Sequence, residues 1–392
     1  MSTAKKGFAA GLAAGLVIAV ALLALVAPLQ DLLPAAGTQS RSDQAREIIG
    51  DSYFRETDEE KLEDASVAGM VRKISRENED KFSHYFDPAA YKRFRAASSG
   101  QFSGIGLNVT ESKRGLRIAR VFDGTPAQAA GLAVGDEIVA VEGKSIAGSS
   151  ATAASSQIKG RKGTEVTITV VAGRSGKRRV LDVERAEVRI PAVESRMERR
   201  DGSEIAYVRL ASFTPGAHGE LRNAISKLRA DGAEGLILDL RGNGGGLLDE
   251  AVLVTSLFQD SGPVVTIEGR ARAEQTIEAT GGAIDPIPTA VLVDGSTASA
   301  SEILTAALQQ NDLATVIGTR TFGKGVFQEV IELDAGGALD ITVGEYLTSD
   351  GTSILGTGVV PDQRVEDGDL ESGGDAVLDA GLRQVASELG SG

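Results

Sequence analysis

From about residue 205 onward, short apolar runs alternate with stretches of helical pattern. Three runs have the length and composition of buried strands: Ile205–Leu210, Gly235–Leu240 and Thr289–Val293. Three stretches have the apolar spacing of helices: Ala217–Asp231, Leu247–Phe258 and Ser301–Gln310. Strands that alternate with helices build a sheet that the helices cover, so this region predicts an α/β core.

The residues from about 101 to 190 have a different character, with shorter strand-like runs separated by glycines and charged turns. These runs are Leu116–Val121, Glu137–Val141 and Val166–Val170. Between the first two lies a short helical stretch opened by Pro126 and closed by Gly131. The arrangement resembles a PDZ domain of the bacterial protease type.

Gly104, Ile105, Gly106 and Leu107 stand where such domains carry their carboxylate-binding loop. Glycines can turn the backbone so that successive N–H groups face the terminal carboxylate of a peptide, while the adjacent strand edge pairs with its main chain. An ordinary glycine-rich turn is the alternative interpretation. Together with the domain pattern, the loop predicts that proteins or peptides with free C-termini bind here.

The N-terminal residues predict where in the cell the protein is located. Residues 7–30 carry no charge and are mostly Ala, Leu and Val, and as a helix they are long enough to span a hydrocarbon core of about 30 Å. Lys5 and Lys6 precede the run and Asp31 follows it, which orients the rest of the chain outside the cytoplasm. The run predicts an uncleaved signal anchor in the cell membrane, with a cleaved signal peptide as the alternative. Gly7, Gly11 and Gly15 recur at every fourth position, a spacing found in membrane homodimers, although small residues are also common in membrane helices that do not pair.

Composition narrows the possible chemistry. The net charge of −14 argues against nucleic acid as a partner. The chain has no cysteine and two histidines, so it offers no thiolate nucleophile and a poor donor set for zinc. Carboxylate-only metal sites remain possible on composition alone, but the serine–lysine chemistry considered next needs neither a metal nor another cofactor.

Ser299 and Lys324 are the residues most suggestive of catalysis. A lysine made neutral by burial can take the proton from a serine hydroxyl and so create a nucleophile. Each residue also has a structural interpretation. Ser299 and Glu302 form an S-x-x-E capping box, and a lysine in a glycine turn is usually exposed. The run up to Lys324 also matches most of a phosphate-binding loop, but Gly325 replaces the Ser or Thr that binds magnesium.

Two further segments fit the same chemistry. If the chain is extended from Lys324, the side chain of Gln328 lies on the same face and can hold the lysine amine by a hydrogen bond. The loop at residues 239–248 follows an apolar run and precedes a helix, so its backbone N–H groups suit an anion or a developing oxyanion. A flexible turn is the alternative for this loop.

These residues together resemble the carboxy-terminal processing proteases, also called tail-specific proteases, from about residue 44 to the C-terminus. The most specific matching segments are Thr297–Ile303, Thr321–Gly325 with Gln328, Asp239–Arg241 with Gly245 and Gly246, and Gly358–Asp362. The resemblance implies Ser299 as the nucleophile, Lys324 as the general base and Gln328 as its orienting partner. It also implies an oxyanion hole formed by the amides of Ala300 and Gly245.

The sequence departs from the family pattern at some positions. Gly244 replaces a frequent proline in the expected oxyanion loop. Lys159 stands where relatives often have an arginine that is implicated in coupling peptide binding to activation. Lysine keeps the charge but loses the bidentate fork, so a regulatory role of Lys159 is an open expectation.

The expected fold class is α+β multidomain, with an N-terminal membrane helix, a helical segment, a PDZ domain and an α/β protease core of the tail-specific type. The expected function is that of a membrane-anchored extracytoplasmic serine endopeptidase. The alternative is a non-catalytic anchored PDZ adaptor that only binds C-termini. The expected boundaries are 1–30 for the cytoplasmic tip and anchor, 31–41 for a linker, 42–97 for the helical segment, 98–190 for the PDZ domain, 191–368 for the protease core and 369–392 for a C-terminal helix and tail.

Overall fold

The computed structural model describes residues 40–98, 101–189, 191–366 and 374–391, and the chain divides into two compact units between Glu79 and Asp80. The anchor expected at residues 1–30 and nearly all of the expected linker lie outside the described residues. Among the residues that are described, none of the helices combines the length and the apolar character needed to cross a membrane.

The smaller unit contributes two helices, α2 (Arg41–Ser52) and α3 (Glu59–Glu77). Asp58 is the N-cap of α3, and its carboxylate accepts a hydrogen bond from the N–H of Lys61 at 3.2 Å. The helical segment expected at residues 42–97 is therefore interrupted. Its last part belongs to the larger unit and contains a strand, β1 (His84–Phe86), before helix α4 (Pro88–Ser98). The strand forms because it pairs with a distant partner, as described below.

The PDZ-like part of the larger unit is built on one antiparallel sheet in the order β3-β4-β5-β7-β8, with β6 beside β5. Its strands are β3 (Leu107–Ser112), β4 (Gly115–Val121), β5 (Glu137–Val141), β6 (Lys144–Ser145), β7 (Glu165–Val171) and β8 (Arg178–Glu184). Helices α5 (Pro126–Ala129) and α6 (Ala151–Ile158) complete it. The first and last strands of the domain, β2 (Gln101–Gly104) and β9 (Ala186–Arg189), pair with each other in an antiparallel ribbon. The expected PDZ strands are confirmed.

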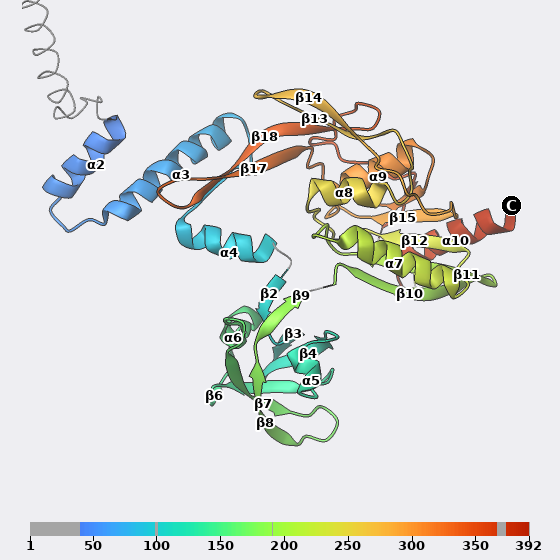
Figure 1. Ribbon diagram of the computed structural model, residues 1–392, viewed down its shortest axis with the longest axis horizontal. Helices are drawn as coiled ribbons and strands as arrows, with labels where there is room; N and C mark the ends of the chain where they lie inside the picture. Colours follow the sequence, from blue (N-terminus) through green and yellow to red (C-terminus); the bar gives the residue numbers. More distant parts are fainter. Residues whose placement is uncertain (1–39, 99–100, 190, 367–373, 392) are drawn as a thin grey trace, which may run out of the picture. The chain divides into compact units, whose positions relative to one another are not determined.

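The protease core has a six-stranded sheet in the order β10-β11-β12-β15-β16-β19, and Figure 1 labels β10, β11, β12 and β15. Its strands are β10 (Val193–Arg200), β11 (Ser203–Leu210), β12 (Gly235–Asp239), β15 (Thr289–Val293), β16 (Thr315–Gly318) and β19 (Gln363–Arg364). All neighbours from β11 onward are parallel, and β10 joins antiparallel at the edge. Parallel strands need crossover connections, and helices supply most of them here.

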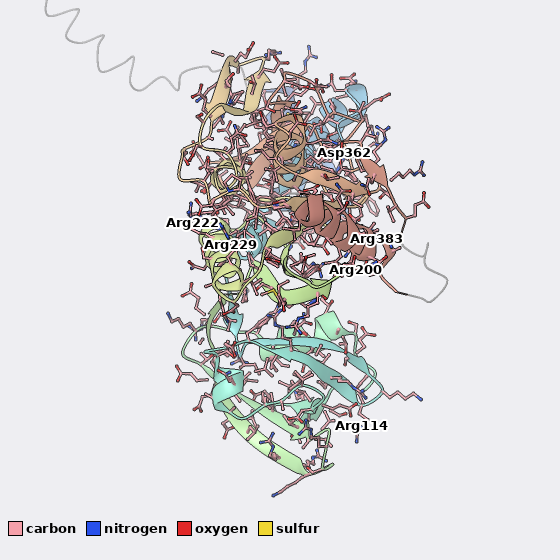
Figure 2. The ribbon with its side chains drawn as sticks, turned by 90° about the vertical axis from the view of Figure 1, so that its right-hand side faces the viewer. Arg114, Arg200, Arg222, Arg229, Asp362 and Arg383 are labelled. Atoms are coloured by element: carbon pink, nitrogen blue, oxygen red, sulfur yellow. The ribbon has the colours of Figure 1, made fainter. Side chains whose placement is uncertain are left out.

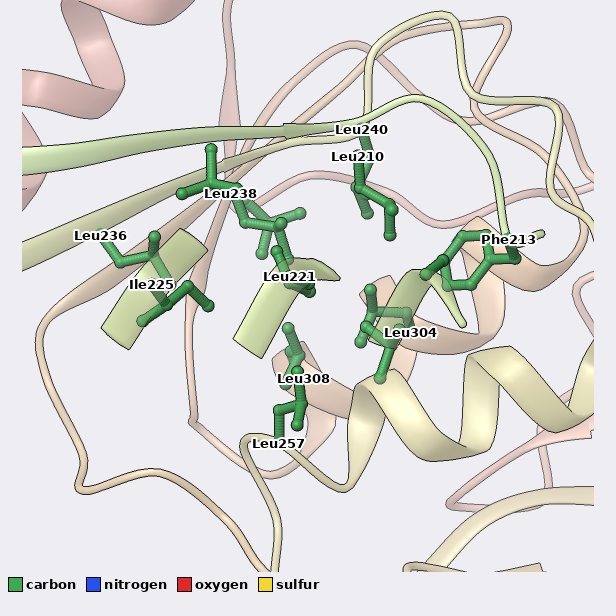
Figure 3. Close-up of a cluster of buried hydrophobic side chains, with 14 of the residues drawn as sticks. Leu210, Phe213, Leu221, Ile225, Leu236, Leu238, Leu240, Leu257, Leu304 and Leu308 are labelled. Carbon is green, nitrogen blue, oxygen red and sulfur yellow. The ribbon is translucent and has the colours of Figure 1, made fainter. Parts of the chain in front are cut away.

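Helices cover both faces of this sheet. On one face, α7 (Ala217–Ala230), α8 (Leu248–Thr255) and α9 (Ala300–Gln310) pack their apolar side chains on the strands, and Figure 3 shows ten labelled members of this cluster, including Leu221, Leu238 and Leu304. On the other face, α10 (Ala376–Ser391) packs on Tyr207 and Ile237. The α/β core predicted from the sequence is confirmed.

A second sheet lies beside α9 and carries part of the site. Its longest strand is β18 (Ala338–Thr348). One edge of β18 pairs with β1 and, farther along, with β13 (Pro263–Gly269), and β14 (Arg272–Glu278) lies beyond β13. The opposite edge of β18 pairs with β17 (Val326–Glu332). Asp340 of β18 is paired with His84 on one side and with Val330 on the other. This pairing brings the start of the larger unit beside residues more than 240 positions later.

Arginines at the surface of the core form hydrogen bonds and ion pairs with neighbouring loops and helices, and several of them are labelled in Figure 2. Arg222 and Arg229 of α7 donate to the carbonyl oxygens of Gly282 and Asp285, which holds the loop before β15. Arg200 and Arg383 both contact the carboxylate of Asp379, which joins β10 to α10. These contacts hold the loops and terminal helix around the central sheet.

Candidate active site

Ser299 lies at the start of α9, directly after the loop that follows β15. Its backbone has φ 57° and ψ −120°, a conformation that is costly for a residue with a side chain. Neighbouring contacts hold the turn in place. The N–H of Ala298 donates to the carbonyl oxygen of Asn243 at 3.0 Å, and the hydroxyl of Thr297 donates to the carbonyl oxygen of Leu240 at 3.0 Å. Backbone strain of this kind, held in place by its surroundings, is typical of functional sites.

A buried carboxylate links Ser299 to Lys324. Glu302 is fully buried, and its Oε2 atom accepts hydrogen bonds from the N–H of Ser299 at 2.8 Å and from the N–H of Lys324 at 2.9 Å. Its Oε1 atom accepts from the N–H of Gly323 at 2.7 Å and from the hydroxyl of Thr321 at 2.5 Å. Because Oε2 of Glu302 accepts from the backbone N–H groups of both Ser299 and Lys324, these two residues, 25 positions apart, are held close together. The S-x-x-E pattern was a visible signal for Glu302, but a local capping box does not predict the contact with Lys324.

Lys324 is half-buried. Its Nζ atom lies 5.0 Å from the centre of the Phe82 ring. Burial lowers the pKa of the Lys324 amine, and the nearby Asp340 carboxylate opposes this shift. Among the described residues, no hydrogen bond joins the amine to the Ser299 hydroxyl or to Gln328. The Nε2 atom of Gln328 instead donates to the hydroxyl of Thr342 at 3.2 Å.

The two backbone amides expected at the oxyanion hole have different surroundings. Ala300 is the first residue of α9, so its N–H has no acceptor within the helix and lies at the positive end of the helix dipole. Gly245 packs directly on Ser299, and a Cβ atom there would approach the Ser299 Cβ to 2.9 Å, so only glycine fits. The N–H of Gly245 donates to Oδ1 of Asn243 at 2.9 Å. An oxyanion would have to compete with that bond.

The strand end before this loop is fixed by an ion-pair network. Arg241 donates to the carboxylate of Asp239 and, through two bonds of 2.8 Å, to the carboxylate of Asp375 just before α10. Tyr207 donates to Asp239 at 2.7 Å. Burial disfavours the charge of Arg241, but its hydrogen bonds to the two carboxylates outweigh burial and raise its pKa further. The Asp239–Arg241 motif therefore anchors the loop at residues 239–248 to the core.

In the PDZ part, the loop from Gly104 to Leu107 leads into β3, an edge strand that pairs with β4 alone among the described residues. Gly106 has φ 89°, and a Cβ atom there would lie 2.3 Å from Thr125, so the turn requires glycine. The open side of β3 is where an added peptide strand could pair. Lys159 follows α6, and the next residue, Gly160, donates its N–H to the carbonyl oxygen of Ser103 beside this loop.

Comparison with known proteins identifies the family. Residues 204–365 match the profile of peptidase family S41, and residues 94–171 match the PDZ domain. A carboxy-terminal-processing protease of Bartonella bacilliformis is 38% identical over 328 residues, which cover 82% of this chain and 73% of the relative. The chain belongs to the carboxy-terminal processing proteases.

Other relatives agree. The carboxy-terminal processing protease CtpA of Bacillus subtilis is 35% identical over 326 residues, covering 83% of this chain and 68% of the relative. Among solved structures, a photosystem II D1 C-terminal processing protease is 29% identical with a TM-score of 0.50, covering 88% of this chain and 91% of the other. The family resemblance drawn from the sequence is confirmed, and the chain is a serine-type carboxy-terminal processing peptidase rather than a binding adaptor.

Proposed function

We propose that this peptidase is an endopeptidase that recognises the C-terminal tails of proteins through its PDZ domain and cleaves them with Ser299 and Lys324. The observation that carries the proposal is the Glu302 carboxylate, which binds the main chains of both residues. The half-buried state of the amine supports the role of a general base, because a base needs a pKa well below the free-lysine value of about 10.4.

In this mechanism the neutral amine of Lys324 takes the proton from the Ser299 hydroxyl, and the serine oxygen attacks the scissile carbonyl. The N–H of Ala300, and that of Gly245 once it releases Asn243, stabilise the oxyanion. The Lys324 ammonium then gives its proton to the leaving amine. The same amine deprotonates a water molecule that attacks the acyl-enzyme, and the Lys324 ammonium then returns the proton to the departing Ser299 oxygen. Gln328, whose Nε2 atom bonds to Thr342 in the structure, orients the amine during the reaction through its other amide atom, Oε1.

The test compares Ser299→Ala and Lys324→Ala with the exposed control variants Ser261→Ala and Lys227→Ala. We expect both site variants to lose cleavage of an unfolded protein by at least about 10³-fold, since each removes a member of one catalytic unit. Mass spectrometry of enzyme treated with a fluorophosphonate should locate the label on Ser299. Undiminished cleavage by either site variant, or labelling elsewhere, would refute the assignment.

We also propose that residues 7–30 anchor the enzyme in the cell membrane with its peptidase part outside the cytoplasm, and that the anchored chains form a homodimer. The supporting observations are the uncharged run, its flanking charges and its glycine spacing. Protease accessibility in spheroplasts and crosslinking in isolated membranes test the two statements. An inaccessible peptidase part would contradict the first, and exclusively monomeric chains would contradict the second.

A further inference from the structure

The amide of Gln328 is held by a chain of hydrogen bonds that ends on Asp80. Nε2 of Gln328 donates to Oγ1 of Thr342 at 3.2 Å, and that hydroxyl donates to Oδ1 of Asp80 at 3.1 Å. Gln328 lies on β17 and Thr342 opposite it on β18, where the register shifts and Val343 is the extra residue. Such a shift in a sheet re-aims side chains next to a site.

The ionisation state of Asp80 decides which atom donates and which accepts in each of these hydrogen bonds. Burial opposes the charge of Asp80, but hydrogen bonds from Ser83, Phe82 and Thr342 outweigh burial and hold the pKa of the carboxyl below its usual value. An ionised carboxylate only accepts, so the single hydroxyl hydrogen of Thr342 is committed to Asp80. The Thr342 oxygen must then accept from Gln328, which places the NH₂ of the amide on Thr342 and leaves Oε1 as the end that can accept.

The segment that contains Asp80 is itself fixed on β18. The N–H of Thr342 donates to Oγ of Ser83 at 2.9 Å, and that hydroxyl donates to Oδ2 of Asp80. The N–H of Phe82 also donates to Asp80, at 2.9 Å, while its ring lies against the Lys324 amine. The same short segment therefore borders the lysine and fixes the partner of Gln328.

We propose that Asp80 and Thr342 are positioning residues of the peptidase, which set the Gln328 amide so that its Oε1 atom accepts an N–H of the Lys324 amine. The inference rests on the proposed function. With its N–H accepted, the amine directs its lone pair at the Ser299 hydroxyl. A flipped amide would present NH₂ to the amine and compete for that lone pair. The other titratable groups described beside this cluster are Glu302, which accepts from the N–H of Lys324, Asp340 of β18, which interacts with both Lys324 and Asp80, and His84 of β1, which interacts with Asp340.

The test uses Thr342→Val, which keeps the shape and removes the hydroxyl, and Thr342→Ser, which restores it. Thr276→Val is the matched control, because that threonine is in the same sheet and, within the described part of the chain, its hydroxyl bonds only to Thr266. With a peptide substrate, we expect Thr342→Val to lower kcat about tenfold with little change in KM, as for an interaction used in the transition state. Thr342→Ser should recover most of the rate, and Thr276→Val should behave as wild type.

The pH profile separates positioning from simple loosening. A hydrogen bond to Oε1 of Gln328 stabilises the ammonium form of Lys324. If the amide loses its orientation, the pKa of the Lys324 amine falls. The acid limb of the kcat-versus-pH profile then moves to lower pH. A loosened sheet would admit water to the amine and move that limb to higher pH, towards the free-lysine value. A ¹³C NMR titration of Lys324 reads the same shift directly and does not require activity.

A double-mutant cycle with Gln328→Ala completes the test, since Thr342→Val should add no further loss once the amide is gone. The proposal is overturned if Thr342→Val keeps the wild-type kcat and Lys324 pKa, if the limb moves to higher pH, or if the two losses add. These outcomes are distinct from failure of the proposed function, in which the wild-type enzyme would not cleave or Ser299→Ala would remain active.

Discussion

In the proposed mechanism Lys324 is the general base, and its environment combines two opposing influences on the pKa of its amine. Burial favours the neutral amine, whereas the carboxylate of Asp340 favours the charged form. Burial also raises the pKa of Asp340, although its neighbours His84 and Lys324 oppose that shift. Burial is the larger influence on the lysine, so the amine becomes neutral at a lower pH than a free lysine does.

The first prediction is that Asp340→Asn moves the acid limb of kcat to lower pH. The substitution removes the negative charge that stabilises the Lys324 ammonium, so the amine loses its proton more readily and the base is available at lower pH. A kcat-versus-pH series on a peptide substrate measures this. Asp334→Asn, in the exposed turn between β17 and β18, is the control. A limb that moves to higher pH would contradict the explanation.

At the scale of elements, α8 supports the start of α7. The buried carboxylate of Glu250 accepts hydrogen bonds from the N–H groups of Gly216 and His218 at 2.5 and 3.1 Å, and it contacts the His218 ring at 2.9 Å. It therefore caps a helix N-terminus from another helix. Burial opposes the charge of Glu250, but these hydrogen bonds outweigh burial and lower its pKa.

The second prediction is that Glu250→Gln lowers the free energy of unfolding by about 1–3 kcal/mol near neutral pH, the range for hydrogen bonds to a buried charge. Because the folded-state pKa of Glu250 lies below the ordinary value of 4.5, its contribution is present above that value and is lost as pH falls through the folded-state pKa. Urea unfolding at several pH values measures the difference. The exposed neighbour variant Asp249→Asn should show little loss, and a deficit that grows towards acid pH would disprove the cap.

At the scale of the whole molecule, the PDZ domain is inserted between two segments of the larger unit. The β2–β9 ribbon joins both ends of the domain, and it leads on one side to the loop at Gly104–Leu107 and on the other towards β10 of the core. The PDZ part and the protease core each have their own hydrophobic cluster within this unit, so in the proposed function tail capture and peptide cleavage depend on different parts of it. A defect in one part should be separable from a defect in the other.

The third prediction is that Gly106→Val abolishes tail binding while Ser299 still reacts with a fluorophosphonate. A side chain at this position would overlap Thr125 and would need an unfavourable positive φ, so the loop cannot keep its shape. Fluorescence anisotropy with a labelled C-terminal peptide measures binding, and the amidated peptide is the ligand control. Gly219→Ala, a helical position with open space, controls for loss of a glycine. Unchanged peptide affinity would exclude this loop as the carboxylate site.

Features of this protein that arise from local patterns could be predicted from the amino-acid sequence. The buried strands at residues 235–239 and 289–293, the helix after Ser299 and the PDZ strands each depend on apolar periodicity within a few residues. The motifs around Ser299, Lys324 and Gly245 were sufficient to indicate the peptidase family. By contrast, the more polar strands β10, β14 and β18 lack a strong local signal and form because neighbouring strands pair with them.

The tertiary structure alone decided how the site is assembled. A capping-box glutamate proved to hold Lys324 as well as Ser299, and Gln328 proved to bond to Thr342 rather than to the lysine. Asp80 and Phe82 reach the site only because β1 pairs with β18, more than 250 residues later. Hydrogen bonds between such distant residues depend on how the whole chain folds, and no local sequence pattern predicts them.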